Sequence, residues 1–211
     1  MYRSGRSYEN LNKAIFAGEG KYNIPILKPS NTKPEEWIGF NYAKGCNRPE
    51  GKGIHFFLDD YQFARVWAEP DRYIGILQRF QTVMTPDFSL YMDFPKAVQI
   101  YNHYRKHWLG AYWQAKGIQV IPTIGWSDEE SFEWCFDGEP RQSIVAVSSV
   151  GTQGQEDARK QFLAGYFAML EKLKPTQIIF YGKVPEECKE NIVRVKQFCD
   201  KWNTAELAQW E

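Results

Sequence analysis

The chain has 211 residues, a length that suits one large domain or two very small ones. Hydrophobic residues make up 43% and charged residues 25%, which excludes a chain that is disordered throughout. The 26 basic and 26 acidic side chains cancel, which argues against a protein that wraps duplex nucleic acid through a general positive surface. Aromatic residues reach 16%, enough to fill a core and to leave rings for stacking on bases.

The four cysteines form no CxxC pair and lie at no zinc-like spacing to a histidine; they are Cys46, Cys135, Cys188 and Cys199. Residues 1–6 are polar, no apolar signal segment follows them, and no apolar run approaches the ~20 residues of a membrane span. We therefore expect reduced, mostly buried cysteines, a cytoplasmic location and no membrane partner.

The elements expected in chain order start with an arm or short helix over residues 1–23 and an edge strand over 24–27, which contains Pro25. Many Pro, Gly, Asn and Lys residues over 28–53 indicate a long loop. From Ile54 onward, apolar strands alternate with amphipathic helices. Strands are expected over residues 54–58, 82–85, 118–124, 143–148 and 177–181, and helices over 61–67, 71–80, 95–116, 129–136, 156–173 and 186–200. Residues 204–211 are expected to form a C-terminal tail, which leaves 24–203 as a single domain.

Alternating strands and helices predict an α/β domain of repeated strand–helix units with a mainly parallel sheet, because parallel strands need long crossovers. About six strands are fewer than the eight that close a (β/α) barrel. We therefore expect an incomplete TIM-like barrel, with an open doubly wound sheet as the alternative. In both architectures ligands bind at the carboxyl ends of the strands.

Acidic residues follow two of the expected strands directly. Asp59 and Asp60 follow the first, and Asp87 follows the second, too far before Pro95 to cap the next helix. Paired carboxylates in a partly buried cleft suit general acid–base or nucleophilic chemistry, because one pKa is pushed upward. We therefore expect Asp87, with Asp59 or Asp60, to be catalytic.

Further polar, aromatic and glycine residues lie at or near the ends of the expected strands. The expected ligand-binding residues are Ser89, Tyr91, Asn102, Arg105, Trp126, Asp128, Ser148, Ser149, Gly151, Tyr181 and Gly182. For Asp128 the alternative is that it caps the helix that follows it. The small residues from Ser148 to Gly154 can expose N–H groups to a phosphate, but they contain no complete phosphate motif, so an ordinary loop is the alternative.

His103 and His107 lie four residues apart on an expected helix, as metal ligands can. The glutamate of an H-E-x-x-H motif is missing between them, and we expect no metal and no other cofactor. With Arg105 and Lys106 these histidines form a basic patch, which is either a solvated helix face or a contact with phosphate groups.

Four motifs carry a resemblance to a known family: PDFS at 86–89, N-x-Y-R at 102–105, IPTIGW at 121–126 and SSVG at 148–151. With them, residues 35–185 resemble an uncharacterised domain family common in bacteriophages, plasmids and integrative elements. The resemblance implies a phage or mobile-element protein acting in a bacterial host, without an established activity.

A more distant similarity is to the transglycosylases that exchange guanine for a deazaguanine in tRNA or phage DNA. It implies a (β/α) barrel with strand-end aspartates, for which the comparable positions are Asp87 and one of Asp59 or Asp60. The zinc-binding Cys/His cluster of those enzymes is missing, and their glycine-rich loop has no counterpart beyond SSVG.

Three functions stay open at this point. The first is an enzyme acting on a glycosidic or phosphate bond of a nucleotide or nucleic acid, with Asp87 as nucleophile or base and Arg105 as phosphate anchor. Tyr91 and Trp126 would then stack on the base. The second is a non-catalytic binder that sequesters a nucleotide signal or blocks a host defence protein. The third is a DNA-binding accessory protein for element replication, against which the zero net charge counts.

Overall fold

The computed structural model describes residues 7–8 and 11–195, with side chains from Lys13 onward. The end of the helix expected over 186–200, the tail expected over 204–211 and Cys199 lie outside the described residues.

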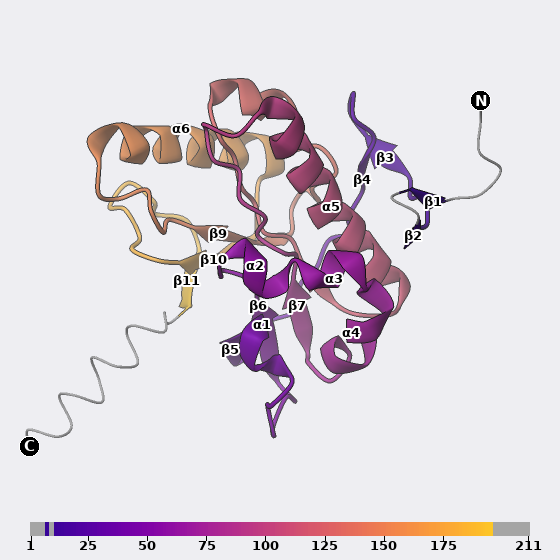
Figure 1. The fold of residues 1–211 in the computed structure, drawn as a ribbon. Coiled ribbons are helices and arrows are strands. Elements are labelled where there is room, and N and C mark those ends of the chain that lie inside the picture. Colours follow the sequence, from indigo (N-terminus) through magenta and orange to yellow (C-terminus); the bar gives the residue numbers. More distant parts are fainter. Residues whose placement is uncertain (1–6, 9–10, 196–211) are drawn as a thin grey trace, which may run out of the picture.

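Parallel strands form the centre of the fold, and their order in space follows their order in the chain (Figure 1). The first sheet contains β5 (Glu36–Gly39), β6 (Lys52–His55), β7 (Thr82–Met84) and β8 (Val120–Ile121); the second contains β9 (Ile144–Ser148), β10 (Gln177–Tyr181) and β11 (Ile192–Val195). A parallel bridge between Thr123 and Ala146 connects the two sheets. The α/β class and the mainly parallel sheet are thereby confirmed.

The incomplete TIM-like barrel stays a prediction. Neither sheet shows the reversal of strand order that defines a doubly wound sheet, and the strands described between residues 7 and 195 close no barrel. The chain therefore has sequentially ordered parallel strands in an open arrangement.

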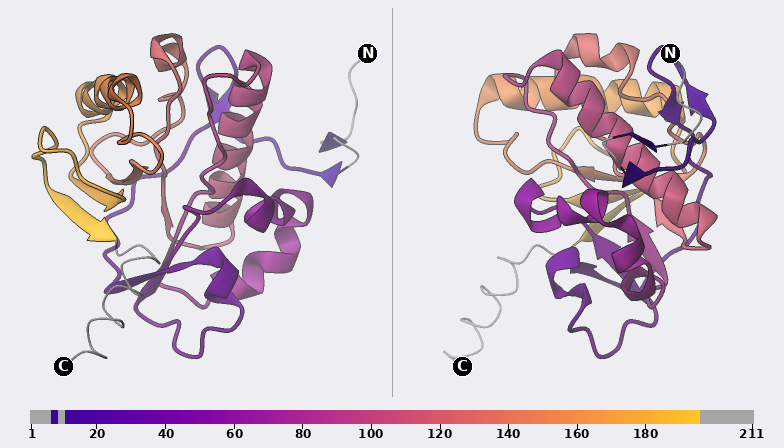
Figure 2. Two further views of the ribbon diagram at one scale, coloured as in Figure 1. Left: turned by 60° about the vertical axis from the view of Figure 1, so that its left-hand side comes forward. Right: turned by 45° about the vertical axis from the view of Figure 1, so that its right-hand side comes forward.

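Helices connect the parallel strands. They are α1 (Phe40–Ala43), α2 (Asp60–Phe63), α3 (Arg65–Ala68), α4 (Pro70–Leu77), α5 (Lys96–Ala115), the 3₁₀ helix η1 (Glu129–Glu133) and α6 (Glu156–Leu173). The first sheet and α1–α4 lie at one end of the molecule, α6 lies at the other, and α5 runs between them (Figures 1 and 2). The helices expected over 95–116 and 156–173 thus correspond to α5 and α6 within a residue or two.

The core uses both faces of the strands. On the face that the helices cover, Trp108 of α5 packs with Val83 and Val120, and a second cluster joins α6 to β9 and β10. Successive strand residues point to opposite faces, so Met84 and Ile121 point away from α5. They belong to a third apolar cluster shared by both sheets, which contains Phe57, Met84, Ile121, Ile144, Ala146, Ile179 and Val195.

The amino-terminal part forms two antiparallel strand pairs. β1 (Ser7–Tyr8) pairs with β2 (Leu11–Asn12), and β3 (Gly18–Glu19) pairs with β4 (Ile24–Pro25). The described residues of 1–23 contain no helix, which was one of the two alternatives expected there, and the strand expected over 24–27 is present as β4. The turn between β3 and β4 uses two positive φ angles, at Gly20 and Asn23, which glycine and asparagine tolerate.

Two further expectations are wrong. The expected loop over 28–53 contains β5 and α1, because a short apolar segment around Trp37 and Ile38 suffices to extend the sheet. The expected helix over 186–200 is instead a strand at Ile192–Val195, whose β-branched residues suit a sheet better than a helix. Among the described residues, no helix combines the length and the apolar character needed to cross a bilayer.

Candidate active site at the ends of the parallel strands

Asp87 lies just beyond the carboxyl end of β7, with its side chain half-buried. Within residues 13–195 its carboxyl group makes no hydrogen bond and no ion pair. Burial raises the pKa of Asp87 to about 7, against an opposing effect of Lys106 and with a smaller upward contribution from Asp60. A carboxyl group that titrates near neutral pH can both give and take a proton, which is the property of a general acid or base.

Asp60 opens α2, and its carboxylate holds the segment that follows β7. Ser89 donates to Asp60 Oδ1 from its backbone nitrogen at 3.2 Å and from Oγ at 2.9 Å. Asn102 of α5 donates from Nδ2 to the Ser89 carbonyl at 2.7 Å. The structure thus brings Asp60, Ser89, Asn102 and Asp87, all expected from the sequence, to one edge of the first sheet.

Arg105 of α5 belongs to the same edge. Its guanidinium group lies 3.6 Å from the centre of the Phe88 ring, and Nη2 lies 3.9 Å from Asp60 Oδ2. The side chain is 17% exposed. Arg105 is therefore held between a ring and a carboxylate, where it contributes positive charge to the site without extending into solvent.

Lys106, expected from the sequence only as part of a basic patch, and Glu139, which no sequence pattern indicates, are both buried at this edge. Lys106 Nζ donates to the Thr123 carbonyl at 2.8 Å and to Glu139 Oε1 at 2.7 Å. His107 Nε2 lies 2.9 Å from the same oxygen. The interpretation of residues 103–107 as a solvated or phosphate-binding patch is wrong for Lys106, His103 and His107, which are at most 4% exposed.

The other expected residues lie apart from Asp87 or make contacts of their own. Asp59 is exposed, and its side chain makes no capping bond to α2. Tyr91 is 62% exposed, and its ring contacts Phe94. Trp126 packs on Phe162, with ring centres 5.4 Å apart.

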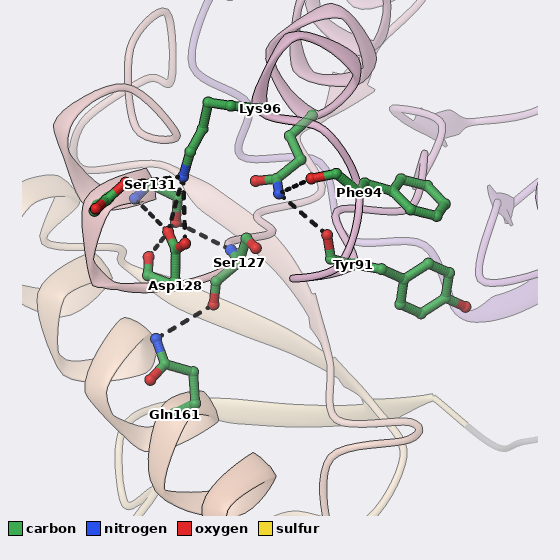
Figure 3. Close-up of polar contacts among 9 residues, drawn as sticks. Tyr91, Phe94, Lys96, Ser127, Asp128, Ser131 and Gln161 are labelled. Atoms are coloured by element: carbon green, nitrogen blue, oxygen red, sulfur yellow. Dashed lines mark hydrogen bonds and ion pairs between the residues drawn. The ribbon is translucent and has the colours of Figure 1, made fainter.

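Asp128 is a helix cap, as one of the two interpretations of the sequence predicts. It accepts a hydrogen bond from the backbone nitrogen of Ser131 at 3.0 Å, at the start of η1. Lys96 of α5 extends toward it and lies 3.1 Å away, while Gln161 of α6 donates to the Ser127 carbonyl (Figure 3). These contacts join α5, η1 and α6 next to the candidate site.

The loops that follow β9 and β10 satisfy their own polar groups. Ser149 Oγ donates to the Lys183 carbonyl at 2.7 Å, and Ser148 Oγ accepts from the Val150 nitrogen at 3.2 Å. Gly151 and Gly182 have φ angles of +80° and +107°, which allow the tight turns. Tyr181 stacks on Phe57 with ring centres 4.8 Å apart, so it connects β10 to the end of β6.

The described cysteines, Cys46, Cys135 and Cys188, are free, and the last two are buried as expected. Burial raises the pKa of Cys135 to about 12. A thiol of this kind stays protonated at neutral pH and makes a poor nucleophile.

Comparisons with known proteins place the chain among phage proteins. The profile described as "Domain of unknown function (DUF4417)" matches residues 16–199. The "Gene 1 protein" of Mycobacterium phage D29 is 36% identical over 193 residues, which cover 90% of this chain and 72% of that protein. The "Gene 1 protein" of Mycobacterium phage L5 is 34% identical over 193 residues, which cover 90% of this chain and 84% of that protein. No solved structure matches the chain.

Proposed function

The chain belongs to the family described as Domain of unknown function (DUF4417). We propose that it is an enzyme that cleaves the N-glycosidic bond of a nucleotide. The reaction takes place at the carboxyl ends of the parallel strands. The observation that carries the proposal is the carboxyl group of Asp87, which is half-buried, unpaired among the described residues and has a pKa raised to about 7.

Two carboxyl groups in different surroundings support this chemistry. Asp87 has no partner and keeps its proton near neutral pH, which suits a general acid. Asp60 accepts hydrogen bonds from Ser89 and lies beside Arg105, surroundings that suit a carboxylate. Glycoside cleavage uses such a pair, one carboxyl group as acid and one as carboxylate.

At the start of the reaction Asp87 is protonated. Its proton passes to the leaving base as the bond between the base nitrogen and the sugar C1′ breaks. The Asp60 carboxylate stabilises the positive charge that develops at C1′. Water then adds to C1′, and the proton that it loses restores Asp87 through the solvent, so no further reactant is needed.

Exposed rings support a nucleotide as the substrate class. Tyr61 is 78% exposed and Tyr91 is 62% exposed. The first directly follows Asp60, and the second lies two residues beyond Ser89. Bases stack on exposed aromatic rings with little dependence on sequence, each stack contributing about 1–3 kcal/mol.

Release of free base from a panel of nucleosides and nucleotides, separated by chromatography, tests the proposal. We expect Asp87→Asn to lower kcat by about 100-fold or more, because the amide cannot transfer a proton. In the wild type, kcat/KM should fall as the pH rises through about 7, when Asp87 loses its proton. Asp93→Asn is the matched control, since it makes the same change at an exposed position of the same segment and should leave kcat unchanged.

Two outcomes would contradict the enzyme. The first is an Asp87→Asn variant that releases base as fast as the wild type. The second is a nucleotide that raises the melting temperature of the wild type without ever being cleaved, which would identify a non-catalytic nucleotide binder instead.

A further inference from the structure

A buried cluster of two histidines and a glutamate lies beside the candidate site and takes no part in the proposed reaction. His103 and His107 are one helical turn apart on α5, and their ring centres are 4.4 Å apart. Glu139 comes from the segment after η1. The three residues are at most 5% exposed, and their nearest nitrogen and oxygen atoms lie within 4.8 Å of one another.

Each histidine is oriented by a backbone carbonyl. His103 Nε2 lies 3.2 Å from the Asp137 carbonyl, and His107 Nδ1 lies 2.9 Å from the Pro25 carbonyl. A carbonyl oxygen only accepts hydrogen bonds, so both of these ring nitrogens carry hydrogen. The opposite nitrogens, His103 Nδ1 and His107 Nε2, therefore point toward the cluster. Histidines that bind metal ions are oriented in the same way, with the second nitrogen donating to a carbonyl or carboxylate.

Two polar atoms of the cluster lack a hydrogen-bond partner within the described part of the chain. They are His103 Nδ1 and Glu139 Oε2, both fully buried. A buried polar atom without a partner costs about 1–3 kcal/mol, so such atoms are uncommon unless an ion or a water molecule binds them. Here a nitrogen lone pair and a carboxylate oxygen, both ligands that zinc accepts, are unsatisfied in one cluster.

We propose that His103, His107 and Glu139 bind one divalent transition-metal ion of the zinc type. Three ligand atoms at ~2 Å from one ion lie about 3.3 Å from one another. The ligand atoms of these side chains now lie within 4.8 Å of one another, so side-chain shifts of about an ångström bring them to bonding distance. A cavity of about 210 Å³, lined by Asp137, Glu139 and Lys172 among others, adjoins the cluster. The cavity reaches Glu139, and neither histidine lines it.

The ammonium group of Lys106 lies beside the proposed metal site and would repel a bound cation. This ammonium group binds Glu139 Oε1 and the Thr123 carbonyl, and it leaves Oε2 open. The ion is therefore assigned to the Oε2 side, while Lys106 holds the other oxygen from outside the coordination sphere. On binding, the proton that His107 Nε2 shares with Glu139 Oε1 is released, and the freed lone pair of Nε2 becomes available to the ion.

Titration of the chelator-treated protein with Co²⁺ tests the site, because cobalt reports its ligands by absorption. We expect one equivalent to bind with the visible bands of low-symmetry cobalt and without a thiolate charge-transfer band, which separates this site from the free cysteines. Calorimetry with Zn²⁺ in buffers of different ionisation enthalpy should show proton release.

His103→Gln is the informative variant, since its amide can still donate to the Asp137 carbonyl while the ring nitrogen ligand is lost. We expect it to lower Co²⁺ affinity at least tenfold. His55→Gln is the matched control, because His55 is the third histidine of the chain and lies on β6. This variant should still bind one equivalent of Co²⁺. Asp87→Asn should also bind cobalt normally, which separates this proposal from the proposed enzyme activity.

Three results would overturn the metal site. They are a wild-type protein that binds no Co²⁺, a spectrum dominated by thiolate bands, or equal affinity in a folded His103→Gln variant and the wild type. If that variant does not fold, the wild-type spectrum and stoichiometry still decide the question.

Discussion

Burial acts to raise the pKa of both Asp87 and Glu139, and the neighbouring charges decide the direction of the net shift. Burial raises the pKa of Asp87 to about 7, because no described cation binds its carboxyl group. Burial acts on Glu139 in the same direction, but Lys106 and His107 outweigh it and hold the pKa of Glu139 below its ordinary value. The neighbouring charges, more than the extent of burial, therefore decide which of the two carboxyl groups is protonated at neutral pH.

The raised pKa of Asp87 makes the stability of the protein depend on pH. The native state keeps a proton that the unfolded chain loses above its ordinary value of 3.8, so stability should fall as the pH rises from about 4 to about 7. Asp87→Asn removes this effect. We expect the variant to be more stable than the wild type above pH 7, by on the order of 4 kcal/mol, and equally stable near pH 4.

Urea unfolding of both proteins across this pH range measures the difference. Parallel pH profiles would show that Asp87 ionises as it does in the unfolded chain. Such a result would also remove the main support for its role as a general acid. The gain in stability and the loss of activity in one variant are the combination expected of a catalytic group.

At the scale of elements, the sequence predicted well where periodicity is long. α5 and α6 repeat apolar residues over many turns, and β9 and β10 are unbroken apolar runs. Segments of two to four residues carry too little pattern, which is why β5 was expected as loop and β11 as helix.

The candidate site was predictable to a similar extent. Asp60 and Asp87 were found because strand ends in a parallel sheet converge on one edge. Glu139 was missed, and Lys106 was expected only in a basic patch, because their pairing joins α5 to a segment 33 residues away and no local pattern reports such a contact. The burial of a lysine on an amphipathic helix depends on that partner.

The contact between α6 and Trp126 gives a prediction for a single element. A Cβ atom at Gly165 would lie 2.2 Å from Trp126 Nε1, so the helix can approach the ring only with glycine there. Gly165→Ala should destabilise the protein by about 1–3 kcal/mol, although alanine is the better helix former.

Gly75→Ala in α4 is the control for this substitution, because nothing lies within 4 Å of the added Cβ. It should leave stability unchanged or raise it by up to about 1 kcal/mol. Equal effects of the two changes in thermal unfolding would show that Trp126 moves aside without cost.

At the scale of the whole molecule, the two sheets meet at the ends of β7 and β8. Thr85 Oγ1 accepts from the Thr123 nitrogen at 2.8 Å, and Thr123 Oγ1 donates to the Thr85 carbonyl at 2.8 Å. Thr123 also forms the bridge to Ala146 of β9. The third apolar cluster spans the same junction, with Met84 and Ile121 from one sheet and Ile179 from the other. Polar and apolar contacts thus join the first and second sheets at one junction.

If this junction makes the two sheets one cooperative unit, weakening it should weaken both sheets equally. Thr85→Val keeps the shape of the side chain but leaves the buried Thr123 N–H without its acceptor, which should cost about 1–3 kcal/mol. Thr82→Val is the matched control, because the Thr82 hydroxyl only donates to the Gln119 carbonyl and no backbone N–H depends on it.

Hydrogen exchange of the Thr85→Val variant, resolved by segment, should show the same loss of protection in β6 and β7 as in β9 and β10. A loss confined to β9 and β10 would mean that the second sheet opens independently, and that the candidate site rests on the first sheet and α5 alone.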